Sequence, residues 1–251
     1  MAATAALLTR TNLAAVLTLG DNQYELGEPE NFLASYDPTW GRVKGITHPS
    51  PGNHDYYTAG AAGYFGYFGA AAGDPQRGYY SLDVGRWHLV SLNSECAQVG
   101  GCHAGSPQEV WLRADLAAHP TQCTLGYWHH PRFGSSGVGH EHAQPAMSAL
   151  WEVLHGSGAD VVLSGHAHNY ERLAPQDATG RFAPEDGIRS FVVGTGGKDL
   201  EAFGAIAANS EVRSSEAFGV IELALHPTRY AWRFVSAQGS MFTDAGSGRC
   251  R

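Results

Sequence analysis

The apolar residues of this chain gather in short runs that end in glycine, histidine or a tryptophan followed by histidine. Continuous apolar runs of about four to eight residues between turn signals are typical of strands that are buried on both faces of a sheet. The pattern therefore predicts buried strands at residues 13–19, 123–128, 161–164 and 190–193.

Two further pairs of segments predict antiparallel strands. The first pair, residues 79–84 and 87–92, flanks the turn Gly85-Arg86. The second pair, residues 216–225 and 229–236, comes late in the chain. The second half is thus more antiparallel than the first.

Helices are predicted at residues 2–9, 106–119 and 147–155. The clearest start signal is Ser106-Pro107-Gln108-Glu109, a capping box with proline at the first helical position. Between the regular elements we expect loop and short helix at 36–42, an extended piece at 46–51, a constrained loop at 52–55 and a packed but irregular loop at 58–78.

Together these elements predict the α/β class, as a mixed sandwich of two packed sheets rather than a purely parallel doubly wound sheet. The composition does not shift along the chain and no repeat occurs. We therefore expect residues 1–251 to form a single domain.

The charge balance excludes some classes of partner. The formal net charge is −8, and the only lysines are Lys44 and Lys198, so no basic surface for nucleic acid is expected. No apolar run approaches the roughly 20 residues that span a bilayer, so no membrane partner is expected. The first residues lack the basic and apolar regions of a signal peptide.

The four cysteines form no CxxC pair, which argues against a structural zinc site. Cys96 and Cys102 flank a loop with glycine and could close a short disulfide, as in proteins of oxidising compartments. Free thiols in a cytosolic enzyme are the alternative. Four cysteines allow three pairings, so the sequence leaves the pairing open.

Side chains with metal-binding atoms stand where the predicted strands end, and sites in α/β sheets form at the carboxyl ends of strands. A carboxylate can bridge two metal ions, and amide oxygens and imidazoles suit borderline ions such as zinc, iron or manganese. Two ions about 3.5–4 Å apart can clamp a phosphoryl oxygen. The set is Asp21, Tyr24, Asn53, His54, His129, His130, His166 and His168.

Four motifs in this order resemble those of the calcineurin-like metallophosphoesterases, whose fold is a two-sheet αββα sandwich. Tyr24 and the segment Tyr170-Glu171-Arg172 resemble the corresponding residues of the purple acid phosphatases, a branch of this superfamily, and in particular of the bacterial type. The resemblance covers nearly all of the chain from Leu13 onward. The motifs are Gly20-Asp21-x-x-Tyr24, Gly52-Asn53-His54-Asp55, His129-His130-Pro131 and Gly165-His166-Ala167-His168.

The resemblance implies a centre of two metal ions, iron with zinc, manganese or a second iron. Asp21 would bridge the ions. Tyr24 and His168 would bind the first ion, and a ferric ion on the Tyr24 phenolate would give a purple colour. The second ion would be bound by Asn53, His129 and His166.

The resemblance also implies catalytic roles. His54 would lie beside the phosphate, as an electrostatic stabiliser or as a proton donor to the leaving group, and Asp55 would orient His54. His140 lies roughly where the family has a histidine that faces the substrate.

Two other histidines carry weaker signals. Gly139-His140-Glu141-His142 imitates a metal motif but follows a glycine-serine loop, so we expect it to line the substrate pocket and not to bind metal. His130 is open between a surface role and a supporting role.

One family motif is missing. The family begins with a strand that ends in Asp-x-Gly or Asp-x-His, whose aspartate binds the first ion. Residues 1–20 contain no Asp, Glu or His. We therefore expect the sequence to start late, without its first strand, and to have a weak or empty first metal site. Backbone groups beside residues 13–19 would then lack partners.

The resemblance implies hydrolysis of small phosphomonoesters by a metal-bound hydroxide. A phosphodiesterase of the same superfamily is one alternative. A catalytically weak protein that binds phosphate or metal is another, because the first aspartate is absent. The full-length protein is expected to be extracellular or periplasmic, and the sequence leaves the oligomeric state open.

Overall fold

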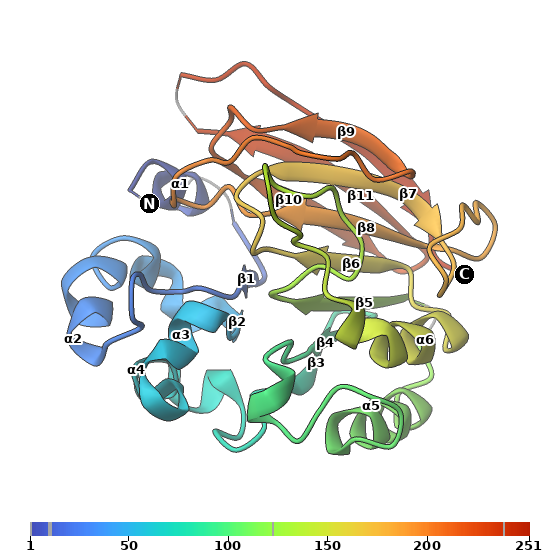
Figure 1. Ribbon diagram of the computed structural model, residues 1–251, viewed down its shortest axis with the longest axis horizontal. Helices are drawn as coiled ribbons and strands as arrows, with labels where there is room; N and C mark the ends of the chain where they lie inside the picture. The colour runs from blue at the N-terminus through green and yellow to red at the C-terminus, as the bar shows by residue number, and fades with distance from the viewer. Residues whose placement is uncertain (1, 10–11, 122, 238) are drawn as a thin grey trace.

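A seven-stranded sheet forms the centre of the structure, a computed structural model that describes residues 2–9, 12–121, 123–237 and 239–251 (Figure 1). Four neighbouring strands are parallel, and the other three are each antiparallel to a neighbour. In order across the sheet the strands are β3 (Tyr80–Val84), β4 (Trp87–Ser91), β5 (Cys123–Trp128), β6 (Val161–Ser164), β8 (Ile188–Val193), β7 (Tyr170–Gln176) and β9 (Ser210–Ser214).

Two smaller sheets pack against one face of the large sheet (Figure 1). The first pairs β1 (Val16–Leu19) with β2 (Thr47–Ser50) in parallel. The second is the antiparallel series β10 (Gly219–His226), β11 (Arg229–Ser236) and β12 (Ala245–Arg249). The predicted two-sheet α/β architecture is thus confirmed in outline, with the second layer divided into two parts.

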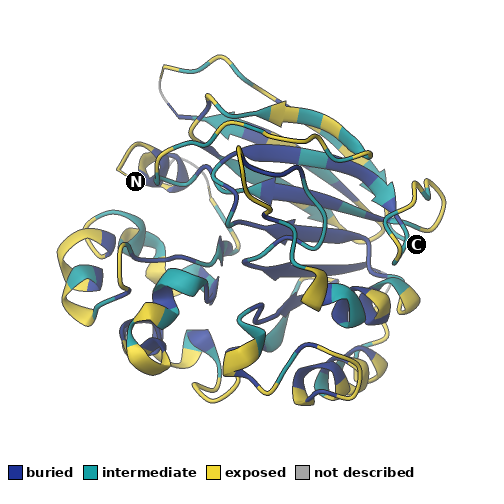
Figure 2. Ribbon diagram, viewed as in Figure 1, coloured by how far each residue is buried: buried dark blue, intermediate teal, exposed yellow. Residues whose placement is uncertain are grey.

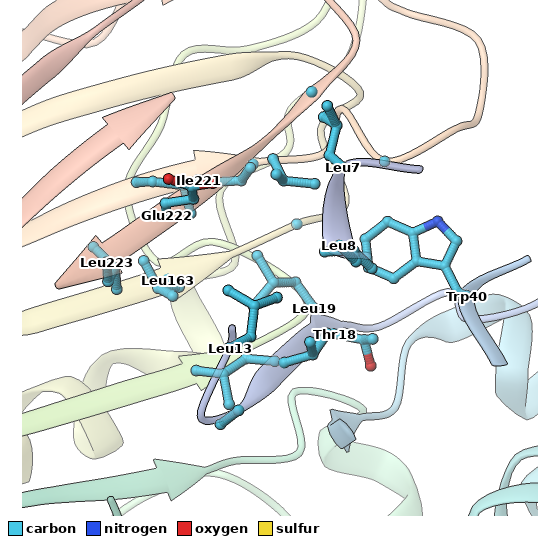
Figure 3. A pocket seen from close by; sticks show the side chains of 18 of the residues that line it. Leu7, Leu8, Leu13, Thr18, Leu19, Trp40, Leu163, Ile221, Glu222 and Leu223 are labelled. Atoms are coloured by element: carbon cyan, nitrogen blue, oxygen red, sulfur yellow. The ribbon is translucent and has the colours of Figure 1, made fainter. Parts of the chain in front are cut away.

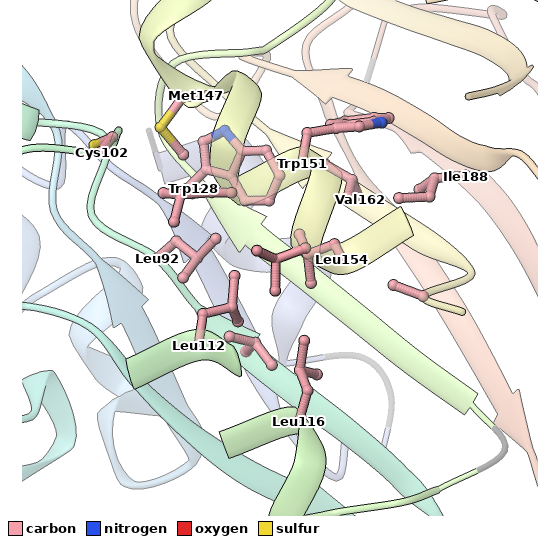
Figure 4. Close-up of a cluster of buried hydrophobic side chains, with 14 residues drawn as sticks. Leu92, Cys102, Leu112, Leu116, Trp128, Met147, Trp151, Leu154, Val162 and Ile188 are labelled. Atoms are coloured by element: carbon pink, nitrogen blue, oxygen red, sulfur yellow. The ribbon is translucent and has the colours of Figure 1, made fainter. Parts of the chain in front are cut away.

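The opposite face of the large sheet is covered by α5 (Pro107–Ala118) and α6 (Ser148–Gly156) (Figure 4). Leu112 of α5 and Trp151 of α6 are buried against Trp128 and Val162. The strands of the large sheet are mostly buried, whereas the helices present exposed outer surfaces (Figure 2). Each fully buried side chain of this kind stabilises the fold by about 1.5–3 kcal/mol.

The N-terminal third of the chain forms several short helices. Among all the described helices, none is long and apolar enough to cross a membrane. Phe32, Tyr36, Tyr64 and Phe68 form an aromatic cluster among them. The α-helices are α1 (Ala2–Leu8), α2 (Pro29–Asn31), α3 (Asn53–Tyr57) and α4 (Ala62–Phe68). The 3-10 or π segments along the chain are η1 (Phe32–Tyr36), η2 (Trp40–Ile46), η3 (Ala59–Ala61), η4 (Gly69–Ala72), η5 (Cys96–Gln98) and η6 (Pro145–Met147).

The predicted strands and helices all occur, with small shifts at their ends. The cap of α5 is half of a capping box. Ser106 Oγ accepts from the Glu109 backbone N–H, but the Glu109 carboxylate accepts from Gly105 instead of Ser106.

Several expectations were wrong. Residues 58–78 are not an irregular loop, because α4 lies within them, and residues 53–57 form α3. Aromatic packing of Tyr64 and Phe68 outweighs the low helix propensity of the glycines there. β7, β9 and β12 were not predicted. β7 lacks the usual apolar pattern of a strand because it carries the buried, charged Glu171. The Glu171 carboxylate is stabilised there by accepting hydrogen bonds from the N–H and Oγ of Ser135.

A cavity of about 860 Å³ lies between β1 and β10, lined by apolar residues such as Leu13, Leu19, Leu163 and Ile221 (Figure 3). Within the described residues β1 pairs only with β2, and β10 pairs only with β11. Each strand therefore has one edge without a strand partner among the described residues.

All four cysteines are paired, which excludes the free-thiol alternative. Cys96 bonds Cys102, which is one of the pairings that the sequence left open. Cys123, at the start of β5, bonds Cys250, 127 residues later. The long disulfide joins the large sheet to the end of β12.

We expect the two disulfides to differ in their contribution to stability. Replacing Cys123 and Cys250 by alanine should lower the free energy of unfolding by about 5 kcal/mol, and replacing Cys96 and Cys102 by about 2 kcal/mol, because the longer loop loses more chain entropy. Guanidinium denaturation of both double variants measures this. Equal losses would contradict the loop-length argument.

Candidate metal centre

The candidate site lies where the carboxyl ends of β1, β2, β5 and β6 meet. Leu19 pairs with Ser50 at the end of the small sheet, and Trp128 pairs with Ser164 at the end of the large sheet. The His129 Nδ1 atom lies 2.7 Å from the Leu19 carbonyl oxygen and joins the two edges. The residues that follow these strands therefore converge, as the strand-end argument predicts.

Asp21 is at the centre of this group. Its backbone is left-handed, with φ of 48°, and its side chain is almost fully buried. The Oδ1 atom accepts from the His54 backbone N–H at 2.9 Å. Burial alone would raise the pKa of Asp21, but the charge and hydrogen bond of His129 hold it well below its usual range. The carboxylate is therefore ionised and attracts a cation.

Tyr24 and His168 form one group of contacts beside Asp21. The Tyr24 hydroxyl is 3.1 Å from Asp21 Oδ2 and 3.3 Å from His168 Nε2. Burial and the Asp21 charge raise the pKa of Tyr24 far above its usual value, and burial lowers the pKa of His168. The neutral His168 imidazole, the Tyr24 phenol and the Asp21 carboxylate are thus in mutual proximity.

His129, Asn53 and His166 form a second group of contacts. His129 Nε2 is 3.3 Å from Asp21 Oδ2, 3.0 Å from Asn53 Oδ1 and 3.1 Å from His166 Nδ1. Because Nδ1–H of His129 faces the Leu19 carbonyl, Nε2 is the atom directed at the group. Burial lowers the pKa of His166 to about 2, so this imidazole is neutral and available as a ligand.

The pKa of His129 moves the other way. Burial would lower it, but the charge and hydrogen bond of Asp21 outweigh burial and raise it. His129 and Asp21 together therefore favour a positive charge between His129 Nε2 and the Asp21 carboxylate. That charge can be a proton or a metal ion. The structure thus brings the six predicted ligands together around one carboxylate.

Two glycines allow this close approach. A Cβ at Gly20 would lie within 3.0 Å of the His129 ring, and one at Gly52 within 3.0 Å of the Asp21 carboxylate and backbone. Gly20 also has a φ of 82°, which disfavours other residues. Glycine before each ligand segment is therefore a steric requirement of the site.

His54 lies at the rim of the group. Its ring contacts Tyr24 and Tyr57, with centroids 4.5 and 4.7 Å apart, and its Nδ1 is 2.5 Å from the Glu25 carbonyl oxygen. The sequence predicts that Asp55 orients His54, but no hydrogen bond joins these side chains in the described part of the chain.

Asp55 instead shapes the loop. Its buried carboxylate accepts from Gly52 N at 2.9 Å and from Asn22 Nδ2 at 3.0 Å. Burial and the nearby Asp21 charge raise the pKa of Asp55 to about 7. Asp55 therefore holds the segment that carries Asn53, rather than the His54 ring.

The remaining histidines lie beside the group. The His130 ring is 4.1 Å from the His166 ring, and His130 Nδ1 is 3.1 Å from Ser94 Oγ. His140 and His142 both contact Glu201, a residue that the sequence did not single out. Glu201 lies in a loop without a motif, so only the fold reveals its position.

The chain is similar to proteins of known family. Residues 2–170 match the family model described as calcineurin-like phosphoesterase. Purple acid phosphatase 15 of Arabidopsis thaliana is 33% identical over 97 residues, which cover 38% of this chain and 18% of that protein. Acid phosphatase type 7 of Homo sapiens is 29% identical over 187 residues, which cover 64% of this chain and 41% of that protein.

The fold has a solved counterpart. The purple acid phosphatase PPD1 from yellow lupin seeds has a TM-score of 0.76 at 18% identity, over 98% of this chain and 48% of that chain. This likeness shows the fold alone. The chain spans less than half of the length of the curated relatives named above.

We expect Gly52→Ala to weaken metal binding by about 10- to 100-fold, because the added methyl group displaces Asp21. Metal affinity measured by titration, together with the unfolding temperature, tests this. Gly66→Ala is the matched control, since a Cβ at Gly66 meets nothing within 4 Å. Equal affinities in the two variants would show that Gly52 does not position Asp21.

Proposed function

The chain belongs to the calcineurin-like phosphoesterase family, and from that premise we propose that it hydrolyses phosphate esters at a centre of two metal ions that share Asp21. One observation carries the proposal. Asp21 Oδ2 lies 3.1 Å from the Tyr24 hydroxyl and 3.3 Å from His129 Nε2. A single carboxylate oxygen in contact with donors of both proposed sets is what a bridging ligand requires.

The residues present fit two borderline ions. Carboxylate, phenol, amide oxygen and imidazole are donors for iron, zinc and manganese. The first ion would be held by Asp21, Tyr24 and His168. The second would be held by Asp21, Asn53, His129 and His166. With a phenolate at the first position, we propose iron there and zinc, manganese or iron at the second.

Two ions held there would lower the pKa of a bound water towards neutrality and stabilise charge on the phosphoryl oxygens. The chain's own side chains orient these donors. Asn53 Nδ2 donates to the Tyr57 hydroxyl at 3.1 Å, which directs the Asn53 amide oxygen towards His129. His129 is held by Leu19, as described above.

His54 is placed to move a proton. Because its Nδ1 faces the Glu25 carbonyl oxygen, Nε2 is the atom free to donate to a leaving oxygen. The rings of Tyr24 and Tyr57 hold the imidazole in place. We propose that His54 protonates the leaving group of a small phosphomonoester, the substrate class favoured by Tyr24 and by the relatives named as acid phosphatases.

A second candidate function is metal or phosphate binding with little turnover. The observation that favours it is the unequal number of donors, three at the first position and four at the second. Under this alternative only the second position would be filled. We propose an oxidising compartment for either function, because both disulfides persist there.

We expect the purified, metal-loaded protein to hydrolyse para-nitrophenyl phosphate faster than the bis-ester, with two metal ions per chain. His166→Ala should lower kcat/KM by at least about 100-fold, because it removes a ligand. His226→Ala, an exposed histidine at the end of β10, is the control and should retain activity. One ion per chain with no turnover of either ester would favour the binding protein, and faster turnover of the bis-ester would favour a diesterase.

The iron-loaded protein should absorb visible light through a phenolate–ferric transition, and Tyr24→Phe should abolish this band while metal remains at the second position. Tyr36→Phe is the matched control, since the buried Tyr36 hydroxyl has no hydrogen-bond partner in the described part of the chain. Visible spectra and metal counts of both variants check this. A band that survives in Tyr24→Phe would exclude Tyr24 as the iron ligand.

A further inference from the structure

A second group of metal-binding side chains lies outside the proposed centre. His140 and His142 come from the loop after β5, and Glu201 comes from the loop after β8. His140 Nε2 lies 2.7 Å from Glu201 Oε1, and His142 Nε2 lies 2.9 Å from Glu201 Oε2. One donor atom from each of the three residues lies within 4.8 Å of the other two.

The two loops are held together by their backbones. Ser136 N donates to the Ala205 carbonyl at 3.0 Å, and Gly204 N donates to the Ser136 carbonyl at 2.8 Å. Glu201 N donates to the His168 carbonyl at 2.8 Å. The three side chains are therefore brought together by main-chain contacts that do not depend on their own charges.

His142 is buried without a hydrogen bond. Its side chain is 4% exposed, and neither ring nitrogen makes a hydrogen bond with the described residues. Glu201 Oε2 lies 2.9 Å from His142 Nε2 without forming a hydrogen bond to it. An unpaired buried polar group costs about 1–3 kcal/mol, so this imidazole needs a partner that a carboxylate in this position does not supply.

The other two residues are prepared for a ligand. His140 Nδ1 faces the Val138 carbonyl oxygen at 3.3 Å, which leaves Nε2 directed at Glu201. A Cβ at Gly137 would lie within 3.0 Å of Glu201 Oε1 and His140 Nε2. Glycine at position 137 therefore keeps open the space in which the donor atoms meet.

We propose that His140, His142 and Glu201 bind a zinc ion that is separate from the two ions of the Asp21 centre. Two imidazoles and one carboxylate are a zinc ligand set that leaves a fourth position open. The sequence interpretation, in which this histidine pair lines the pocket without binding metal, is thereby revised. A simple ion pair is the competing explanation, but it leaves both nitrogens of His142 without a hydrogen bond.

The site adjoins the centre without sharing a ligand. The His142 and His166 rings have centroids 5.4 Å apart. The proposal does not rest on the proposed hydrolysis, because zinc binding is measured without any substrate.

The test is zinc titration in an Asp21→Asn/His129→Gln background, which removes donors of the main centre and contacts none of the three residues. This background should still bind zinc, and adding Glu201→Gln should weaken the affinity at least about tenfold. Glu141→Gln is the matched control, because it removes the same charge from an exposed residue between the two histidines and should leave the affinity unchanged. Equal affinities after Glu201→Gln and Glu141→Gln would overturn the proposal.

A second variant guards against misfolding. His140 is 52% exposed, so His140→Gln removes a ligand with little effect on the core. Cobalt replacing zinc should give the visible spectrum of a four-coordinate ion in the background protein, and this spectrum should be lost in His140→Gln at an unchanged unfolding temperature. A background protein without such a spectrum, or a His140→Gln variant that retains it, would overturn the assignment.

Discussion

The contact between His129 Nδ1 and the Leu19 carbonyl oxygen joins the large sheet to the small β1–β2 sheet at the candidate centre. Gly165 N also donates to the His129 carbonyl, and a Cβ at Gly165 would meet the Leu19 oxygen. The ends of β1, β5 and β6 are therefore in direct contact. A shift of either sheet would move Asp21 relative to His129 and separate the two halves of the centre.

Backbone conformation, as well as side-chain rotamers, aims the donors. Asp21 and His166 both have positive φ, at 48° and 63°. Such conformations cost on the order of 1–3 kcal/mol each in residues other than glycine and persist where the surroundings enforce them. Here Gly20 and Gly52 admit the close packing, and Asp55 ties the Gly52 and Asn22 backbones together. The strained backbone at Asp21 and the residues that stabilise it are therefore neighbours in the structure.

Much of the fold and of the residues that meet at the candidate site was predictable, because continuous apolar runs specify buried strands and side chains with potential ligand atoms follow directly after them. What was missed has a common cause. β7 carries buried charge, α4 depends on aromatic packing between segments, and Glu201 lies in a loop whose position is set by pairing with Ser136. Asp55 was correctly noted as constrained, but which groups it contacts depends on the turn at Asn22. Each of these features is decided by contacts between distant segments, which local sequence patterns do not encode.

The long disulfide has a consequence for biosynthesis. Cys96, Cys102 and Cys123 are all made long before residue 250 is added, so among the cysteines of residues 1–251 Cys123 first meets Cys96 and Cys102. Thiol–disulfide exchange can trap such pairs and must then reverse them, over seconds to hours. The yield of correctly paired protein therefore depends on the timing of oxidation relative to synthesis.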